Sequence, residues 1–145
     1  MTESLCNWIL FVLNRANELR KSINKVKLQK ILFLIKNELG LDIPANFKPY
    51  KFGPYSVDID KALNKLEKEK LVEIELLPNS SKKDNIDSDY KYVIKPLKDS
   101  KITMKGDDLN YIDRLIRMST EDLLAYVYIK FPQYTRRYIY LKKIY

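Results

Sequence analysis

The side chains that most often carry catalysis are scarce in this chain, which has no histidine and a single cysteine, Cys6. Imidazole is the usual general base at neutral pH and a common metal ligand, so its absence excludes serine–histidine triads and histidine-ligated zinc. One cysteine excludes a cysteine-rich zinc site and an internal disulfide. Two adjacent carboxylate pairs, Asp107–Asp108 and Glu121–Asp122, are better explained as acidic residues that favour the start of a helix. We therefore expect a non-enzymatic protein without a metal or a cofactor.

The charge of the chain favours a binding role. Its 27 basic and 19 acidic residues give a formal charge of +8, and a basic balance of this kind is typical of nucleic-acid partners. The charge is uneven, because residues 57–90 carry 6 basic and 9 acidic residues whereas the segments on both sides are net basic. The acidic segment includes the helix and hairpin that would contact DNA, which counts against a simple DNA-binding protein.

The N-terminal sequence lacks the positively charged region of a signal peptide. The longest early apolar stretch, residues 8–13, has six residues, whereas a membrane span needs roughly 20. A lone cysteine in a chain without an export signal fits a reducing compartment. We therefore expect a cytoplasmic protein that does not enter the membrane.

Apolar periodicity predicts five helices and two strands. The helices are expected at residues 3–19, 25–39, 57–70, 107–118 and 120–130, and the strands at residues 71–76 and 90–95. Ser56 and Ser119 are expected to cap the third and fifth helices. Residues 44–56 contain three prolines and a glycine, which predicts a fixed, non-helical connection before the third helix.

Three helices followed by a hairpin are typical of a winged helix, a helix-turn-helix variant with a β wing. We predict a mainly α fold with a small antiparallel β-hairpin (α+β), in which a winged-helix-like three-helix core precedes C-terminal helices. Residues 1–145 are expected to form a single domain. The core and its hairpin (71–95) would occupy residues 1–96, and a C-terminal helical extension would occupy residues 107–145. The tail from Tyr134 onward is either a last short helix or an arm.

The outward face of the third helix is a candidate DNA-binding surface. Its polar residues, opposite the apolar stripe, are Lys61, Asn64, Lys65 and Lys68. Lysine can bind phosphate or guanine and asparagine can pair with adenine, so this face fits a major groove. Further contacts with the DNA are expected from Lys27, Lys30, Lys82 and Lys83. The alternatives are a solvated helix face balanced by acidic neighbours, and a hairpin that only covers the core.

Two aromatic segments are candidates for binding a protein. The first is the connection before the third helix, where prolines fix the backbone that carries Tyr50, Phe52 and Tyr55. The second is the C-terminal tail, where Tyr134 and Tyr138 are interleaved with basic residues. Tyrosine and arginine are enriched in protein interfaces, but aromatic and basic residues together can also track a nucleic-acid strand. The third alternative is that the tail tyrosines pack against the domain.

Residues 27–35 read Lys-Leu-Gln-Lys-Ile-Leu-Phe-Leu-Ile, and residues 52–56 read Phe-Gly-Pro-Tyr-Ser. A helix with Ile59, Leu63 and Leu66 follows and ends in a leucine-containing turn. With these motifs, residues 1–76 resemble the SocA/Panacea-type domain, whose hallmarks are a Lys-Leu-Gln-Lys-like helix start and an aromatic-Gly-Pro-Tyr-Ser turn. Residues 123–134 are similar to the C-terminal element of the related YwgA-like proteins.

This resemblance implies a compact helical domain that acts by binding proteins. Panacea-type domains serve as antitoxins that neutralise toxins by direct contact, and SocA is an adaptor that delivers a toxin to a protease. The resemblance implies no catalytic residues. Our first hypothesis is therefore a protein-binding module of antitoxin or adaptor type, whose partner is a toxin or a client protein. The alternative is a winged-helix transcriptional regulator on double-stranded DNA, and antitoxins that repress their own operons combine both roles. A homodimer is left open.

Overall fold

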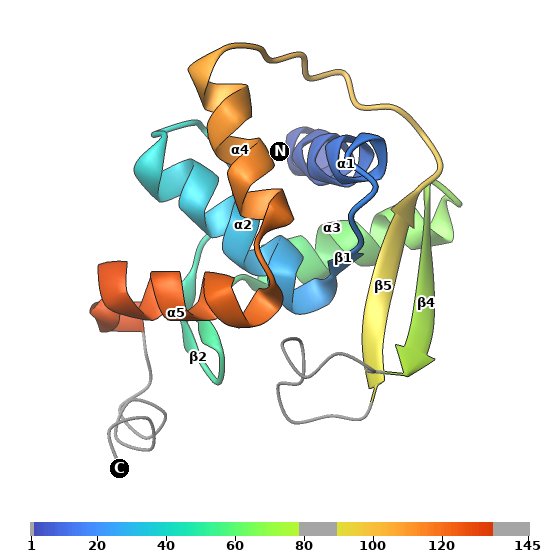
Figure 1. The fold of residues 1–145 in the computed structure, drawn as a ribbon. Coiled ribbons are helices and arrows are strands. Elements are labelled where there is room, and N and C mark those ends of the chain that lie inside the picture. Colours follow the sequence, from blue (N-terminus) through green and yellow to red (C-terminus); the bar gives the residue numbers. More distant parts are fainter. Residues whose placement is uncertain (1, 79–89, 135–145) are drawn as a thin grey trace.

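The computed structural model describes residues 2–78 and 90–134, which form a mainly helical fold with a small sheet (Figure 1). The elements in chain order are α1 (Thr2–Glu18), β1 (Ile23–Asn24), α2 (Lys25–Glu38), β2 (Lys48–Tyr50), β3 (Gly53–Tyr55), α3 (Val57–Lys68), β4 (Val72–Pro78), β5 (Tyr90–Pro96), α4 (Asp107–Arg117), α5 (Thr120–Lys130) and the 3-10 helix η2 (Pro132–Tyr134). The predicted mainly α fold with an antiparallel hairpin is confirmed. The helices begin and end within two residues of the positions that periodicity predicts.

The main sheet has the strand order β1-β5-β4, and all of its pairs are antiparallel. β4 and β5 form the predicted hairpin, with Val72 opposite Pro96 at one end of the register. β1 was not predicted, since two residues are too few to show an alternating pattern. Its residues pair with Ile94 and Val93 of β5, which ties the hairpin to the start of α2.

α2 lies at the centre of the molecule, between α1, α4, α5 and the β2–β3 hairpin (Figure 1). All nine residues from 27 to 35 are buried, whereas periodicity predicted a single buried stripe. A helix that is surrounded on every side has no solvated face, so even its polar residues must find partners inside the protein. This burial determines which groups the two lysines of the Lys-Leu-Gln-Lys motif contact.

The C-terminal helices are tied to the first part of the chain by buried polar contacts. Arg15 of α1 forms a two-pronged ion pair with Asp113 of α4, with both nitrogen–oxygen distances at 2.7 Å. The Asn24 amide donates to the Thr120 hydroxyl at 2.9 Å where α5 begins. Residues of α4 and α5 also belong to the same hydrophobic cluster as α1 and α2.

Two serines stand at helix starts but act differently. Ser119 caps α5 as predicted, since its hydroxyl accepts from the Asp122 N–H at 3.1 Å. Ser56 precedes α3, but its side chain makes no capping hydrogen bond, so that prediction is wrong. Its hydroxyl is buried without a partner among the described residues, because the neighbouring polar side chain, Gln29, bonds to the Ser56 backbone instead.

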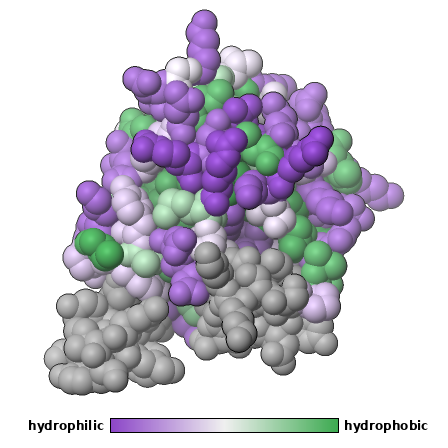
Figure 2. Space-filling view, in the orientation of Figure 1, coloured by the Kyte–Doolittle hydropathy of each residue, from purple (hydrophilic) through white to green (hydrophobic). Residues whose placement is uncertain are grey.

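The face of the molecule shown in Figure 2 is mostly hydrophilic, with separate hydrophobic patches. The large apolar residues that are exposed are Tyr50, Val57, Leu76, Leu77, Tyr92, Leu97 and Ile129. Ile129 is the most exposed of these, at 78%. Within the described ranges, the apolar helices are too short to cross a lipid bilayer.

Candidate protein-binding surface

β2 and β3 form a short hairpin in the segment that the sequence predicts only as a fixed connection. Lys48 pairs with Tyr55, Pro49 with Pro54, and Tyr50 with Gly53. The pair that closes a two-residue loop is hydrogen-bonded and the next pair is not, so Pro49 and Pro54 occupy a pair that needs no N–H and cost the hairpin no hydrogen bond. Tyr50 and Tyr55 lie on the same side of the hairpin, with ring centroids 5.0 Å apart. The hairpin therefore presents a packed pair of tyrosines, of which Tyr50 is 52% exposed.

Two buried side chains of α2 hold this hairpin in place. Lys30 is 2% exposed, and its Nζ donates to the carbonyl oxygen of Pro54 at 2.8 Å. Gln29 donates from Nε2 to the carbonyl oxygen of Ser56 at 2.9 Å and accepts at Oε1 from the N–H of Ser56 at 2.8 Å. The Gln29 amide thus acts like a peptide group of a neighbouring strand and satisfies the backbone between β3 and α3.

Burial lowers the pKa of the Lys30 amine to about 7, because removal from water disfavours its charged form. Among the described residues, the hydrogen-bond acceptor for this amine is the Pro54 carbonyl rather than a carboxylate. An amine donates to a carbonyl in both protonation states. The contact that positions the hairpin is therefore retained when Lys30 loses its charge near neutral pH.

Gly53 allows the hairpin to approach α5 closely. Its φ of +88° lies in the left-handed region that favours glycine, and a Cβ at this position would lie 3.3 Å from Cε1 of Tyr128. Tyr128 is half-buried against the hairpin, and this burial raises the pKa of its phenol. A Cβ at position 53 would require the Tyr128 ring to shift by a few tenths of an ångström, in addition to the backbone strain.

The ring of Phe33, in the middle of α2, joins the hairpin segment to the end of the described chain. It packs edge-on against Phe47 at 5.2 Å, Phe131 at 4.9 Å and Tyr134 at 4.8 Å between centroids. The two segments predicted to bind a protein are therefore neighbours, with β2 beside η2 and β3 beside α5 (Figure 1). Tyr134 is half-buried, which matches the alternative that this tail residue packs against the domain.

We call the surface formed by the β2–β3 hairpin, the end of α5 and η2 the aromatic surface. Its members are Tyr50, Phe52, Tyr55, Tyr128, Ile129 and Tyr134. Tyr50, Phe52, Tyr55 and Tyr134 were predicted from the sequence, whereas Tyr128 and Ile129, in the helix predicted at residues 120–130, were not singled out. Tyr138 lies outside the described residues.

The outward face of α3 has the arrangement that the helical wheel predicts. Its apolar residues Ile59, Ala62, Leu63 and Leu66 are buried. Its polar residues Lys61, Asn64, Lys65 and Lys68 are exposed. Glu67 and Glu69 are exposed beside them, so acidic side chains flank this face. Lys82 and Lys83, which were predicted as wing contacts, lie outside the described residues.

The prediction that Lys27 and Lys30 contact DNA phosphates is wrong. Lys27 is 7% exposed, and its Nζ donates to the carbonyl oxygen of Ile116 at 2.6 Å, near the end of α4. Lys30 donates to Pro54 under the hairpin. Both lysines lie in the stretch of α2, residues 27–35, that is buried on every side, so their amines bind carbonyls of the protein in place of phosphates.

A second polar cluster, which the sequence did not indicate, joins the end of α2 to α4 and α5. Glu38 accepts a hydrogen bond from the Tyr111 hydroxyl and others from the Tyr126 hydroxyl, at 2.7 and 2.9 Å to its two oxygens. Burial, followed by the contact with Glu38, raises the pKa of Tyr126 to about 12 and that of Tyr111 as well. The three residues are far apart in the chain, so spacing alone could not bring them together.

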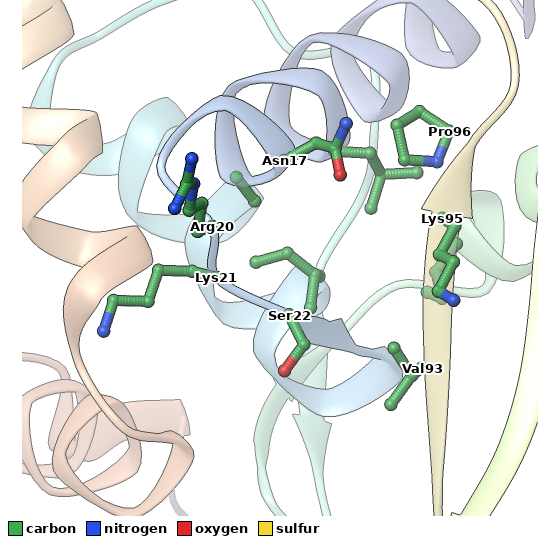
Figure 3. Close-up of a pocket in the computed structure, with 11 residues that line it drawn as sticks. Asn17, Arg20, Lys21, Ser22, Val93, Lys95 and Pro96 are labelled. Carbon is green, nitrogen blue, oxygen red and sulfur yellow. The ribbon is translucent and has the colours of Figure 1, made fainter.

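The described part of the structure can be checked for metal ligands, a reactive thiol and a ligand-sized cleft. It contains no group of three acidic, cysteine or histidine residues able to hold a metal ion. Burial raises the pKa of the Cys6 thiol, which keeps it in its unreactive protonated form. A cleft between α1 and β5 has a volume of about 180 Å³, smaller than the roughly 300–1,000 Å³ of typical ligand pockets. Lys21 and Lys95 at its rim point away from each other (Figure 3).

Comparison with known proteins does not identify the chain: no protein-family model matches it, and no curated protein is significantly similar to it. The resemblance to the SocA/Panacea-type domain therefore depends on the motif residues. Of these, Lys27, Gln29, Lys30 and Ser56 are buried. The side chains of Lys27, Gln29 and Lys30 bond to backbone groups, and the backbone group that Gln29 binds belongs to Ser56. Gln29 and Lys30 position the hairpin of the aromatic surface, whereas Lys27 binds the end of α4.

Proposed function

We propose that this chain is a non-enzymatic, cytoplasmic binding protein of antitoxin or adaptor type that acts through protein–protein contacts at the aromatic surface. The observation that carries the proposal is the fixed placement of exposed Tyr50 and Ile129 on neighbouring segments, above the buried contacts of Lys30 and Gln29. Tyrosine is enriched in interface hot spots, and a surface that is ordered before binding loses little entropy on association.

The resemblance to the SocA/Panacea-type domain supports the same function. Two of its motif residues, Gln29 and Lys30, hold the hairpin, so a shared motif would preserve the shape of this surface while the exposed residues vary with the partner. On this reading the partner is a toxin or a client protein. The proposal assigns no catalytic residue.

Site-specific photo-crosslinking in the source cell tests the proposal. A photoreactive phenylalanine analogue is placed at Tyr50 or Ile129, and at Leu97 as a control that is 57% exposed on the loop after β5. We expect the same protein to be crosslinked from positions 50 and 129 and not from position 97. If neither position captures a protein above the control, the proposal is wrong.

The alternative, a winged-helix regulator on double-stranded DNA, is favoured by the exposure of Lys61, Asn64, Lys65 and Lys68 on α3. The burial of Lys27 and Lys30 reduces the expected phosphate contacts to roughly four, so affinity would fall about a hundredfold between 50 and 200 mM salt. Fluorescence anisotropy with a mixed-sequence duplex checks this. Binding with that salt dependence, abolished by alanine at Lys61, Lys65 and Lys68, would establish the alternative.

A further inference from the structure

β4 is the outer strand of the main sheet. The strand order is β1-β5-β4, so β5 lies between β4 and β1 (Figure 1). Among the described residues, no strand pairs with the outer side of β4. A free strand edge carries backbone donors and acceptors that can bind one more strand. This edge belongs to none of the segments that form the aromatic surface.

The register shows which backbone groups of β4 point to its free side. The Leu97 N–H donates to the Leu71 carbonyl at 2.8 Å, one step before the first pair of β4 and β5. Hydrogen-bonded pairs alternate with pairs that are not, so every second residue of β4 bonds to β5, namely Glu73, Glu75 and Leu77. The residues between them, Ile74 and Leu76, direct their N–H and C=O groups to the free side. An added strand would bond to these groups.

The face of the sheet that covers the hydrophobic core continues past it along this edge. Val72, Ile74 and Leu76 share this face, because side chains alternate along a strand. Val72 is buried and Ile74 packs against the core, whereas Leu76 is 55% exposed. Tyr92, directly opposite Leu76 on β5, is 48% exposed. An added strand with apolar side chains on this face would cover Leu76 and extend the core.

The opposite face of the same edge is acidic. Glu73 is exposed and Glu75 is half-buried on it. Lys95 of β5 stands opposite Glu73 in the register, and its Nζ lies 3.3 Å from a carboxylate oxygen of Glu75, so Lys95 faces two carboxylates. A strand added beside β4 would place its own side chains next to these carboxylates, where basic residues are favoured.

A second copy of this chain is a poor occupant of the edge. If two β4 strands paired antiparallel over all seven residues, Glu75 of each copy would stand opposite Glu75 of the other. A shift by one repeat of the pleat would place Glu73 opposite Glu75 in one direction and Glu75 opposite Leu77 in the other. Like charges directly opposite each other are destabilising, and none of these registers supplies a positive charge from β4. The edge therefore favours a different strand that carries basic residues.

We infer that the free edge of β4 binds an extended segment of a partner protein that alternates apolar and basic residues. The backbone of the segment pairs with Ile74 and Leu76. Its apolar side chains lie beside Leu76, and its basic side chains lie beside Glu73 and Glu75. In this mode of recognition the backbone hydrogen bonds provide affinity and the alternating side chains provide specificity. The inference goes beyond the proposed function and does not depend on it, since it concerns another surface.

Binding of labelled, end-capped peptides to the full chain tests the inference. The main probe has the length of β4 and alternates lysine with valine. One control has the same composition with the valines and the lysines in separate blocks, and another has glutamates in place of the lysines. We expect the main probe to bind at least about tenfold more tightly than each control.

Methylation of backbone nitrogens shows whether the probe adds a strand to the sheet. In a strand at a sheet edge, alternate N–H groups point to the neighbouring strand and to solvent. The probe is therefore made with methyl groups on the nitrogens of all its valines or of all its lysines. We expect one of these peptides to lose at least about tenfold in affinity and the other to bind within about threefold of the unmethylated probe.

Variants of the chain locate the site. Leu76→Pro removes an N–H from the free side and leaves the bonds between β4 and β5 intact, so the main probe should bind at least about tenfold more weakly. Glu73→Lys with Glu75→Lys should weaken the main probe as much and allow the glutamate peptide to bind, a gain that misfolding cannot produce. Asp42→Lys with Glu121→Lys changes the charge equally at exposed residues of other segments, and should leave binding of the main probe within about threefold at physiological ionic strength.

Several results would overturn the inference. They are equal binding of the block or glutamate peptide, equal binding of the two methylated peptides, no binding of the main probe, or unchanged affinity in the β4 variants. A dimer of the chain in sedimentation that Leu76→Pro dissociates would make a second copy the occupant, and would overturn the inference as well. None of these results changes what is crosslinked from positions 50 and 129, so the inference and the proposed function fail separately.

Discussion

The lysines of α2 and those of α3 have opposite surroundings, although both helices have a lysine-rich sequence. On α2, Lys27 and Lys30 are buried, and each donates to a backbone carbonyl of another element. On α3, the lysines at positions 61, 65 and 68 are exposed to solvent. The difference follows from what surrounds each helix: α2 is enclosed by α1, α4, α5, β3 and the strands β1 and β5 of the main sheet, whereas α3 packs through one apolar stripe.

The comparison shows how a charged side chain can be part of the scaffold. A lysine on an enclosed helix must donate to an acceptor inside the protein. For Lys30 the acceptor is the Pro54 carbonyl in the hairpin, and for Lys27 it is the Ile116 carbonyl in α4. Such a buried lysine positions the segment to which it donates. A lysine on α3 is solvated and is available to a partner. Substitutions in α2 should therefore change stability and the hairpin together, while those in α3 should change surface charge alone.

The largest effect is expected from the aromatic centre of α2. Phe33→Ala would remove a fully buried ring that contacts Phe47, Phe131 and Tyr134. The resulting cavity should destabilise the protein by about 3–5 kcal/mol. Urea denaturation measures this change, and crosslinking from position 129 should fall as well. A loss below 1 kcal/mol would contradict the packing described for the two segments.

The buried amine of Lys30, on α2, should make the free energy of unfolding depend on pH, whereas the exposed lysines of α3 should not. The folded pKa of Lys30, about 7, lies below the ordinary value of 10.5, so the unfolded chain binds more protons between these values. Stability should therefore rise with pH, by about 2 kcal/mol from pH 7 to pH 9. Above pH 10 it should fall again, because Tyr111 and Tyr126 have raised pKa values in the folded protein.

Lys30→Met should remove this rise, and Lys65→Met is the matched control that should retain it. Urea denaturation at pH 7, 8 and 9 gives the change in the free energy of unfolding with pH for the unmodified protein and for each of the two variants. A rise that persists unchanged in the Lys30 variant would show that this amine is not the group responsible.

Alanine substitutions at two glycines with positive φ should have smaller and unequal effects on the free energy of unfolding. Gly40, after α2, has φ +69° and no atom within 4 Å of an added Cβ, whereas an added Cβ at Gly53 lies 3.3 Å from Tyr128. Gly40→Ala should cost about 1 kcal/mol from backbone strain alone, and Gly53→Ala about 2 kcal/mol because the contact adds to the strain. Only the Gly53 variant should weaken crosslinking from position 50. Equal results for the two variants would mean that the hairpin does not depend on its contact with α5.

The smallest effect is expected on α3. Replacement of Lys61, Lys65 and Lys68 by alanine should change the free energy of unfolding by less than about 0.5 kcal/mol per residue, because the side chains are exposed. Crosslinking from positions 50 and 129 should be unchanged. A loss of that crosslinking would place part of the protein-binding surface on α3.

Much of the fold could be predicted from the sequence, because five helices and one hairpin have clear apolar periodicity. β2 and β3 could not, since Pro49 and Pro54 argue against strands, and the pairing is possible because the two prolines occupy a pair that is not hydrogen-bonded. The burial of Lys30 had a signal that was missed: apolar residues occupy every face of α2 around it, including Phe33 and Leu34. The Glu38 cluster had no signal, because it depends on how three distant helices pack.

The most direct test of the central claim, that the face held by α2 is the binding surface, compares photo-crosslinking from Tyr50 with crosslinking from Lys65 in the same cells. Both positions are exposed, one on the hairpin and the other on α3. The account predicts a protein crosslinked at position 50 and none at position 65. Crosslinks to protein or DNA at position 65 with none at position 50 would contradict it and move the binding surface to α3.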